Sequence, residues 1–307
     1  MADKPLIIFS HPKPFRPDTT PVQTVAFRSW REAFPWARIF LYGREEGTED
    51  ICRETGLEYA GPVGVEPKSG AALVADLFQK IAAQKGAMNM FINSDIVLGP
   101  RASQAFARLA SLPGPWLASG RRYCLPPFQQ ETFVTVEGLQ SQWATHRRWG
   151  EVTALDYFVW KNFDLADMPD FVIGHCAWDN WMIYQARQRG IPVIDATADM
   201  DAYHFDHGYE YSKGNTCANE RKGPLEERNL RLLGGDGKRF HLGHATHALR
   251  GGQLQKRTGT AVWQRNLELW RLQNPRWERA VKVTRSILHP LIRAWEKNTA
   301  AKEMQFR

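Results

Sequence analysis

The sequence has little cysteine and no long apolar run. Its four cysteines, Cys52, Cys124, Cys176 and Cys217, are scattered and form no Cys-x-x-Cys pair. We interpret them as reduced thiols of a cytoplasmic protein. No apolar stretch approaches the roughly 20 residues that span a bilayer. Met1–Lys4 leads directly into a short apolar segment, so no signal peptide is indicated.

Excess basic charge is also absent from most of the chain. The first 250 residues carry 28 Lys or Arg and 29 Asp or Glu, although the whole chain of 307 residues has a net charge of +7. The basic charge belongs to residues 251–307, which hold twelve Lys or Arg and four Glu. This distribution argues against a catalytic body that binds nucleic acid.

The basic segment 251–307 is also rich in tryptophan, and it suggests helices over 261–297 that are broken near Pro275 and Pro290. The tryptophans are Trp263, Trp270, Trp277 and Trp295. Two interpretations stay open. The segment either lies on an anionic membrane surface, which makes the protein peripheral to the inner face of the cytoplasmic membrane, or forms a helical hairpin packed on the body.

Strand-like and helix-like segments alternate through the rest of the chain. The expected strands are Leu6–Ser10, Ala37–Tyr42, Leu57–Ala60, Trp116–Ser119, Leu155–Trp160 and Pro192–Ile194. The expected helices are Thr20–Phe34, Ser69–Gln84, Arg101–Leu112 and Trp178–Arg189. The alternation predicts an α/β fold with a mostly parallel sheet and helices on both faces. We expect one catalytic domain over 1–250, with an irregular insertion at 124–150, and a helical extension over 251–307.

An apolar run at 88–92 ends in Asn93-Ser94-Asp95 and then turns apolar again. A run of this kind is typical of a buried strand. A carboxylate at the end of such a strand lies where α/β sheets bind ligands. Asp95 is an oxygen ligand suited to a divalent cation beside a diphosphate. The plainer interpretation is an aspartate in the turn after a strand.

Two further carboxylates are candidates for the chemistry. Asp156 begins an apolar strand and is suited to bind a hydroxyl, since a carboxylate accepts strong hydrogen bonds; its alternative is a turn residue. Asp179 lies in Trp178-Asp179-Asn180-Trp181 at an expected helix start. It is a candidate general base for an acceptor hydroxyl, and its alternative is a helix cap favoured by the macrodipole.

Histidines gather near the end of the expected catalytic domain. His204 and His207 lie within four residues, among Asp199, Asp201 and Asp206. Imidazole suits Mn²⁺ and other transition metals, so these two are candidate metal ligands, His204 first. Downstream, His244 and His247 are expected to share a helix face and to bind a metal or a phosphate.

Several cations are candidates for binding a diphosphate. Arg121 and Arg122 directly follow the expected strand 116–119, and Arg228 belongs to a possible lid. Lys13 and Lys68 are better explained as solvated loop residues.

Together these motifs resemble nucleotide-sugar glycosyltransferases of the GT-A fold, of the bacterial cell-surface glycan type. The residues that carry the resemblance are Asn93-Ser94-Asp95, Asp156-Tyr157-Phe158-Val159, Trp178-Asp179-Asn180-Trp181, His204-Phe205-Asp206-His207 and Ala245-Thr246-His247. The resemblance covers roughly residues 5–248. The family's metal-binding triplet usually reads Asp-x-Asp, whereas Asn93 stands first here, so Asp95 is the single carboxylate ligand.

The resemblance implies a nucleotide-sugar donor, a divalent cation (Mn²⁺ or Mg²⁺) and transfer to a hydroxyl of a glycan or lipid-linked acceptor. The cation is then held by Asp95, His204 and, as a second choice, His207. Asp179, or less favourably Asp156, takes the acceptor proton, and we expect inversion. The implied donor contacts are Ser10, His11, Asn93, Ser94, Arg121, Arg122, Trp178, Asn180 and Arg228. Trp178 and Trp181 are expected to form a platform for the acceptor.

Two other functions stay open. One is a metal-dependent hydrolase or phosphotransferase built on a cluster of His204, His207, His244 and His247 with Asp206. The other is a carbohydrate-binding protein without catalytic activity, with a degenerate metal triplet.

Overall fold

The computed structural model describes residues 6–82, 88–128, 138, 141, 144–145, 148–206 and 223–277. The chain divides into two compact units, Met1–Lys256 and Arg257–Arg307. None of the described helices is both long and apolar enough to cross a bilayer.

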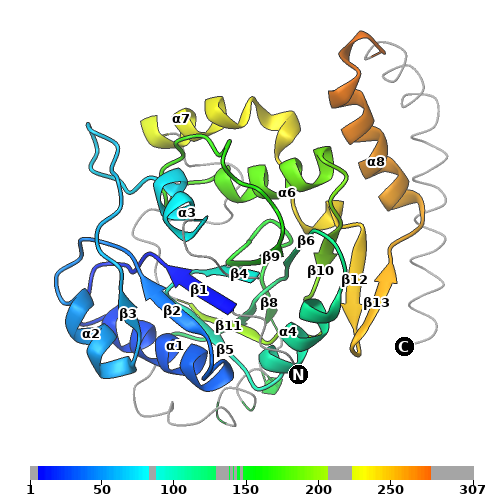
Figure 1. Ribbon diagram of the computed structural model, residues 1–307. Coiled ribbons are helices and arrows are strands. Elements are labelled where there is room, and N and C mark those ends of the chain that lie inside the picture. Colours follow the sequence, from blue (N-terminus) through cyan, green and yellow to red (C-terminus); the bar gives the residue numbers. More distant parts are fainter. Residues whose placement is uncertain are drawn as a thin grey trace. The chain divides into compact units, whose positions relative to one another are not determined.

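The first unit is organised around a nine-stranded sheet (Figure 1). In spatial order its strands are β13 (Gln253–Lys256), β12 (His247–Arg250), β10 (Val193–Asp195), β6 (Trp116–Ser119), β9 (Tyr157–Lys161), β4 (Met88–Ile92), β1 (Leu6–Ser10), β2 (Arg38–Leu41) and β3 (Glu58–Tyr59). Among these strands β9 and β13 run against the others, so the sheet is mostly parallel. The expected α/β class is confirmed.

The first unit also contains a second sheet of four strands, the first of which follows the turn after β4. Its order is β5 (Ile96–Leu98), β11 (Ala202–Phe205), β7 (Tyr123–Leu125) and β8 (Arg148–Trp149). These strands are short and come from segments that the sequence pattern left unassigned. The polar segment around His204 is one of them, and its strand is buried along its whole length.

The helices of the first unit are α1 (Thr20–Ala33), α2 (Thr48–Thr55), α3 (Val74–Ala82), α4 (Ala102–Ser111), α6 (Trp178–Gln188) and α7 (Pro224–Leu233), with short 3₁₀ turns η2 (Asp236–Lys238) and η3 (Leu242–His244). The expected start of α3 at Ser69 is wrong. Ser69 lies in a turn, where its amide and hydroxyl both donate to the carboxylate of Glu66.

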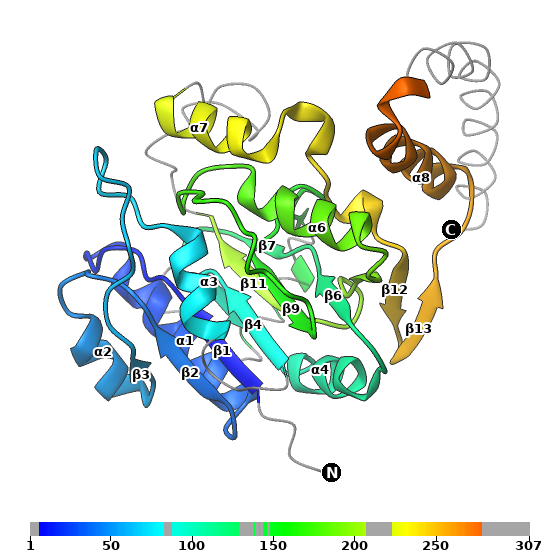
Figure 2. The same ribbon diagram turned by 45° about the horizontal axis from the view of Figure 1, so that its top comes forward.

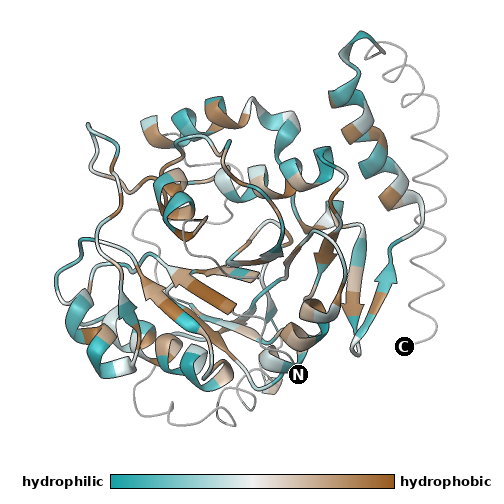
Figure 3. Cartoon of the chain, viewed as in Figure 1, coloured by the Kyte–Doolittle hydropathy of each residue, from teal (hydrophilic) through white to brown (hydrophobic). Residues whose placement is uncertain are grey.

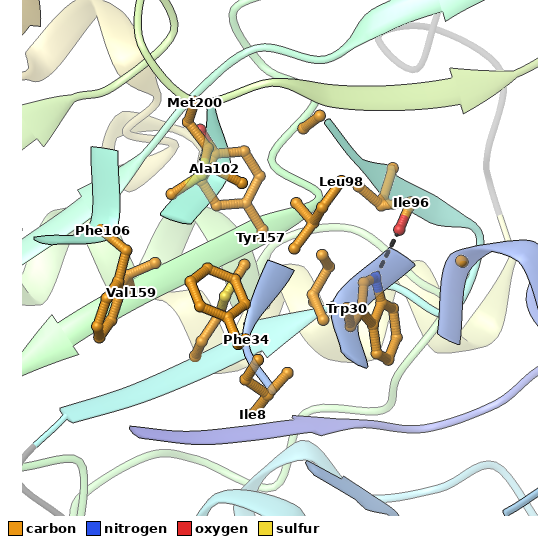
Figure 4. Packing of buried hydrophobic residues seen from close by; sticks show 14 of the residues in the cluster. Ile8, Trp30, Phe34, Ile96, Leu98, Ala102, Phe106, Tyr157, Val159 and Met200 are labelled. Carbon is orange, nitrogen blue, oxygen red and sulfur yellow. Dashed lines mark hydrogen bonds between the residues drawn. The ribbon is translucent and has the colours of Figure 1, made fainter. Parts of the chain in front are cut away.

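Successive side chains of a strand point to opposite faces of the sheet, so this alternation determines which residues enter the core on each face. Even-numbered residues of β1, such as Ile8, pack with α1 and α4, and Figure 4 shows Trp30, Phe34 and Phe106 over this face. Odd-numbered residues, such as Phe9, point to the opposite face. In the hydropathy colouring β1 is strongly hydrophobic, as a strand buried on both faces must be (Figure 3).

The opposite face of the sheet is covered by α3 and α6 (Figure 2). Phe78 of α3 stacks on Trp160 of β9 with ring centroids 5.4 Å apart. Trp178 of α6 meets Phe91 of β4 edge-on at 5.0 Å. This aromatic layer fixes the start of α6 against the centre of the sheet.

The second unit contains α8 (Thr260–Gln273) and η4 (Pro275–Trp277). The helix ends before Pro275, as expected. Residues 278–307, where the break near Pro290 was predicted, lie outside the described residues.

Candidate active site

The polar residues of the site gather at one edge of the large sheet. β1, β4 and β6 run in the same direction, so the residues that follow them, including Asn93, come to the same edge. β9 is reversed and pairs Tyr157 with Ile92, which brings Asp156 to that edge as well. This is the edge at which α/β sheets bind ligands.

Asp95 and His204 meet through the pairing of β5 with β11. His204 lies opposite Ile96, one residue beyond Asp95. Its Nε2 is 3.3 Å from Oδ2 of Asp95, and both side chains are buried. The indole of Trp30 donates to the carbonyl of Ile96 at 2.7 Å and holds the turn (Figure 4). The two residues proposed as metal ligands are therefore brought together, although they are distant in sequence.

Lys13 is a residue of the site that sequence reasoning missed. Its Nζ lies 2.5 Å from Oδ2 of Asp95, so it is not simply a solvated loop residue. Its backbone is held by the fully buried Gln23: Lys13 N donates to Oε1 at 2.8 Å, and Nε2 donates to Lys13 O at 3.1 Å. Lys13 N also lies 3.3 Å from Ser94 Oγ. The sequence carries no signal for this role, because it depends on the burial of Gln23 and on contacts made only in the fold.

Asp156 is the centre of a second polar group. Arg122 Nη1 donates to both of its carboxylate oxygens, at 2.8 and 2.7 Å. Asn93 Nδ2 donates to Oδ1 at 3.1 Å, and Asn93 N donates to the Asp156 carbonyl at 2.8 Å. Both charged side chains are largely buried. Because its carboxylate already accepts hydrogen bonds from Arg122 and Asn93, Asp156 is a poor candidate for a base that takes a proton from a substrate.

Asp179 lies in the first turn of α6, and the surroundings of its carboxyl differ from those of Asp156. Burial, with a smaller contribution from the negative charge of Asp156, raises the pKa of the Asp179 carboxyl to about 6. The amide of Asn180 donates to its Oδ1 at 2.8 Å. Ala177, the residue just before α6 and two before Asp179, has a φ of 89°, a left-handed conformation that is strained for alanine. Asp179 therefore has the pKa expected of a base that works near neutral pH.

The neighbours of Asp179 serve the packing of α6. Trp178 is buried among Phe78, Phe91 and Phe158. Trp181 is buried and packs against Phe171. Neither ring offers a free face, so the expected acceptor platform is not formed by them.

The other expected donor contacts are dispersed. Asn180 Nδ2 donates to the carbonyl of Phe240 at 2.8 Å. Arg121 Nε donates to the carbonyl of Gly150 at 2.6 Å. Arg228 donates to the carbonyl of Asp170, so its expected contact with a diphosphate is not part of this cluster.

Ser10 and His11 lie just before Lys13, at the end of β1. The hydroxyl of Ser10 is fully buried and has no hydrogen-bond partner among the described residues. Burial lowers the pKa of His11, which favours the neutral ring at pH 7. His207, the second-choice metal ligand, lies outside the described residues.

A divalent cation fits the pair Asp95 and His204 by its chemistry. One carboxylate and one imidazole leave most coordination positions to phosphate oxygens and water, as is common for cations that bind with a nucleotide. Among the described residues no group of three or more His, Cys, Asp or Glu side chains is arranged to hold a metal without a substrate.

The histidine cluster expected for a hydrolase does not form within the described part of the chain. His244 ends η3, where its ring stacks on Phe240 at 4.0 Å. His247 begins β12, so the two do not share a helix face. Asp206 pairs with Arg148.

A separate cavity of about 320 Å³ lies beside the β2–α2 connection. Its lining includes Arg44 together with Glu45, Glu46, Glu49 and Asp50. Four carboxylates disfavour a diphosphate, so we do not assign the donor to it.

No family model matches the chain, and no curated protein matches its sequence. Solved structures do match. Glucosyl-3-phosphoglycerate synthase of Mycobacterium tuberculosis is 13% identical, with a TM-score of 0.44, over 76% of this chain and 82% of that one. The mannosyltransferase PcManGT of Pyrobaculum calidifontis, solved with GDP-Man and Mn²⁺, is 11% identical, with a TM-score of 0.41, over 65% of this chain and 56% of that one.

The Arg122–Asp156 pair allows a direct test of the geometry. Arg122→Met leaves a buried carboxylate uncompensated, so we expect the free energy of unfolding in urea to fall by about 3 kcal/mol. Arg38→Met, which breaks an exposed pair with Glu58, is the matched control and should cost under about 1 kcal/mol. Equal losses in the two variants would contradict the buried pair.

Proposed function

We propose that this protein is a metal-dependent glycosyltransferase that moves a sugar from a nucleotide-sugar donor to a hydroxyl of a glycan or lipid-linked acceptor. The observation that carries the proposal is the arrangement at one sheet edge: Asp95 with His204 at one end, and Asp179 with its raised pKa at the other. Asp156 is hydrogen-bonded to Asn93 and lies close enough for its charge to act on Asp179.

In this proposal each carboxylate has its own task. A divalent cation held by Asp95 and His204 supplies positive charge for the diphosphate leaving group. Asp179 accepts the proton of the acceptor hydroxyl, because its pKa near 6 leaves it ionised but still basic at pH 7. Asp156, held in place by its ion pair with Arg122, orients a sugar hydroxyl. Attack from the side of Asp179 in a single displacement inverts the anomeric centre.

The donor and the metal requirement are tested together by thermal denaturation. We expect Mn²⁺ with the matching nucleotide diphosphate to raise the melting temperature by about 5 °C or more at saturating ligand, because ligands that bind only the folded state stabilise it. A panel of UDP, GDP, ADP and their sugars identifies the base.

The metal ligands are tested in the same measurement. Asp95→Asn and His204→Ala should lose the Mn²⁺-dependent shift, while Asp50→Asn, at an exposed carboxylate on α2, should keep it. A folded wild-type protein that is stabilised by no nucleotide at any Mn²⁺ concentration would sink the proposal.

Asp179 is tested by substitution and by pH. With the donor identified above, we expect Asp179→Asn to lower kcat about 100-fold or more. The wild-type rate should rise as the pH increases through about 6 and level off above it, since only the ionised carboxylate accepts a proton.

The same variant should be more stable than the wild type. The folded-state pKa of about 6 lies above the ordinary value of 3.8, so ionised Asp179 destabilises the fold at pH 7 by about 3 kcal/mol. We expect Asp179→Asn to remove this cost above pH 6 and to bring no gain below about pH 4. A variant that is inactive but equally destabilised at both pH values would instead indicate a structural role.

We also propose that residues 251–307 contact an anionic membrane. Their charge is strongly basic, and α8 exposes Trp263 and Trp270, two turns apart on one helix face, at 46% and 41% of their surface. We expect binding to vesicles that contain phosphatidylserine, reduced by 300 mM salt and by the double variant Trp263→Ala/Trp270→Ala. Trp36→Ala, at an exposed tryptophan of the first unit, is the control. Equal binding by all three proteins would contradict the proposal.

A further inference from the structure

We infer that Lys13 and the divalent cation are alternative partners of Asp95, so that the donor's diphosphate and the cation bind cooperatively. The inference rests on the proposed function for the identity of the ligands. The ammonium of Lys13 lies 2.5 Å from Oδ2 of Asp95. The same oxygen faces His204 Nε2 at 3.3 Å.

The position of Lys13 is built into the fold. Gln23, fully buried on α1, accepts from the amide of Lys13 and donates to its carbonyl. These two bonds fix the backbone from which the side chain reaches Asp95. Because the backbone is already ordered, forming the ion pair costs little further backbone entropy.

Asp95 and Lys13 differ in how deeply their side chains are buried. The side chain of Asp95 is only 7% exposed, so its charge must be balanced by a neighbour. The side chain of Lys13 is 41% exposed. Lys13 is therefore able to leave Asp95 without burying a new charge, provided that another cation takes its place.

A divalent cation shared by Asp95 and His204 would need Oδ2 of Asp95 and would meet the ammonium at close range. Like charges at this distance repel, so a cation that binds without a diphosphate competes with the ammonium of Lys13 for Asp95. A diphosphate changes this balance, because its oxygens offer Lys13 a new partner and the cation new ligands. Each ligand then increases the affinity for the other, which is positive coupling.

The experiment measures Mn²⁺ binding by the free-Mn²⁺ electron paramagnetic resonance signal, with and without UDP or GDP. For the wild type we expect weak binding of Mn²⁺ alone and at least tenfold tighter binding with the matching diphosphate. For Lys13→Met we expect Mn²⁺ alone to bind about tenfold more tightly, and the diphosphate to add less than threefold.

Two variants serve as controls. Lys13→Arg keeps the charge and should keep the coupling. Lys80→Met removes the same charge near the end of α3, where that lysine pairs with Asp76, and should behave as the wild type. Melting curves show which variants are folded, and Lys13→Gln replaces Lys13→Met if the latter is not.

The outcomes separate this inference from the proposed function. Unchanged Mn²⁺ affinity in folded Lys13→Met overturns the competition, even where the wild type binds donor and metal. Tighter Mn²⁺ binding by Lys13→Met supports the competition for Asp95, even where no nucleotide binds and the proposed transferase function fails. Absence of Mn²⁺ binding in every variant, with and without diphosphate, overturns both.

Discussion

The site depends on one constraint: the charge of Asp95, buried at the end of a central strand, has to be balanced inside the protein. A bare carboxylate at that depth costs more free energy than most domains have to spare. Lys13, from the chain after β1, meets this need with its ammonium, and His204 of β11 faces the same carboxylate oxygen. On α1, Gln23 fixes the backbone of Lys13, and Trp30 binds the carbonyl of Ile96, the residue after Asp95.

The reversed direction of β9 brings a second buried carboxylate, that of Asp156, to the same edge of the sheet. A parallel strand in this place would begin at the far edge of the sheet, and the residue before it would lie away from the ligand side. Because β9 runs antiparallel to both β4 and β6, Asp156 reaches Asn93 and Arg122. The negative charge of Asp156 at this edge also adds to the burial that raises the pKa of Asp179.

Sequence patterns were sufficient for the strands that are buried on both faces. Leu6–Ser10 and Trp116–Ser119 have the expected bounds because such strands are continuous apolar runs. The short strands of the second sheet escaped notice, since β11 mixes His204 with apolar residues and is defined only by its partners β5 and β7. Local signals cannot reveal a strand whose stability comes from tertiary pairing.

The candidate site residues also fall into two groups, those that a local sequence pattern indicates and those whose role depends on tertiary contacts. Asp95 was recognisable because a polar triplet interrupts an apolar run. Lys13 was not, because its role depends on a glutamine ten residues away and on a carboxylate 82 residues away. Trp178 was misjudged for the converse reason: a tryptophan beside a candidate base suggests stacking on a sugar, whereas its ring fills the space between α6 and the sheet.

The pairing of β7 with β8 has a consequence for how such a site diversifies. The two strands close the base of the segment between Leu125 and Arg148, through the pairs Tyr123 with Trp149 and Cys124 with Arg148. Doubling the length of a segment closed in this way costs only about 0.6 kcal/mol of loop entropy. As far as loop entropy is concerned, the β7–β8 pairing therefore tolerates a change in the number of residues between Leu125 and Arg148 at little cost.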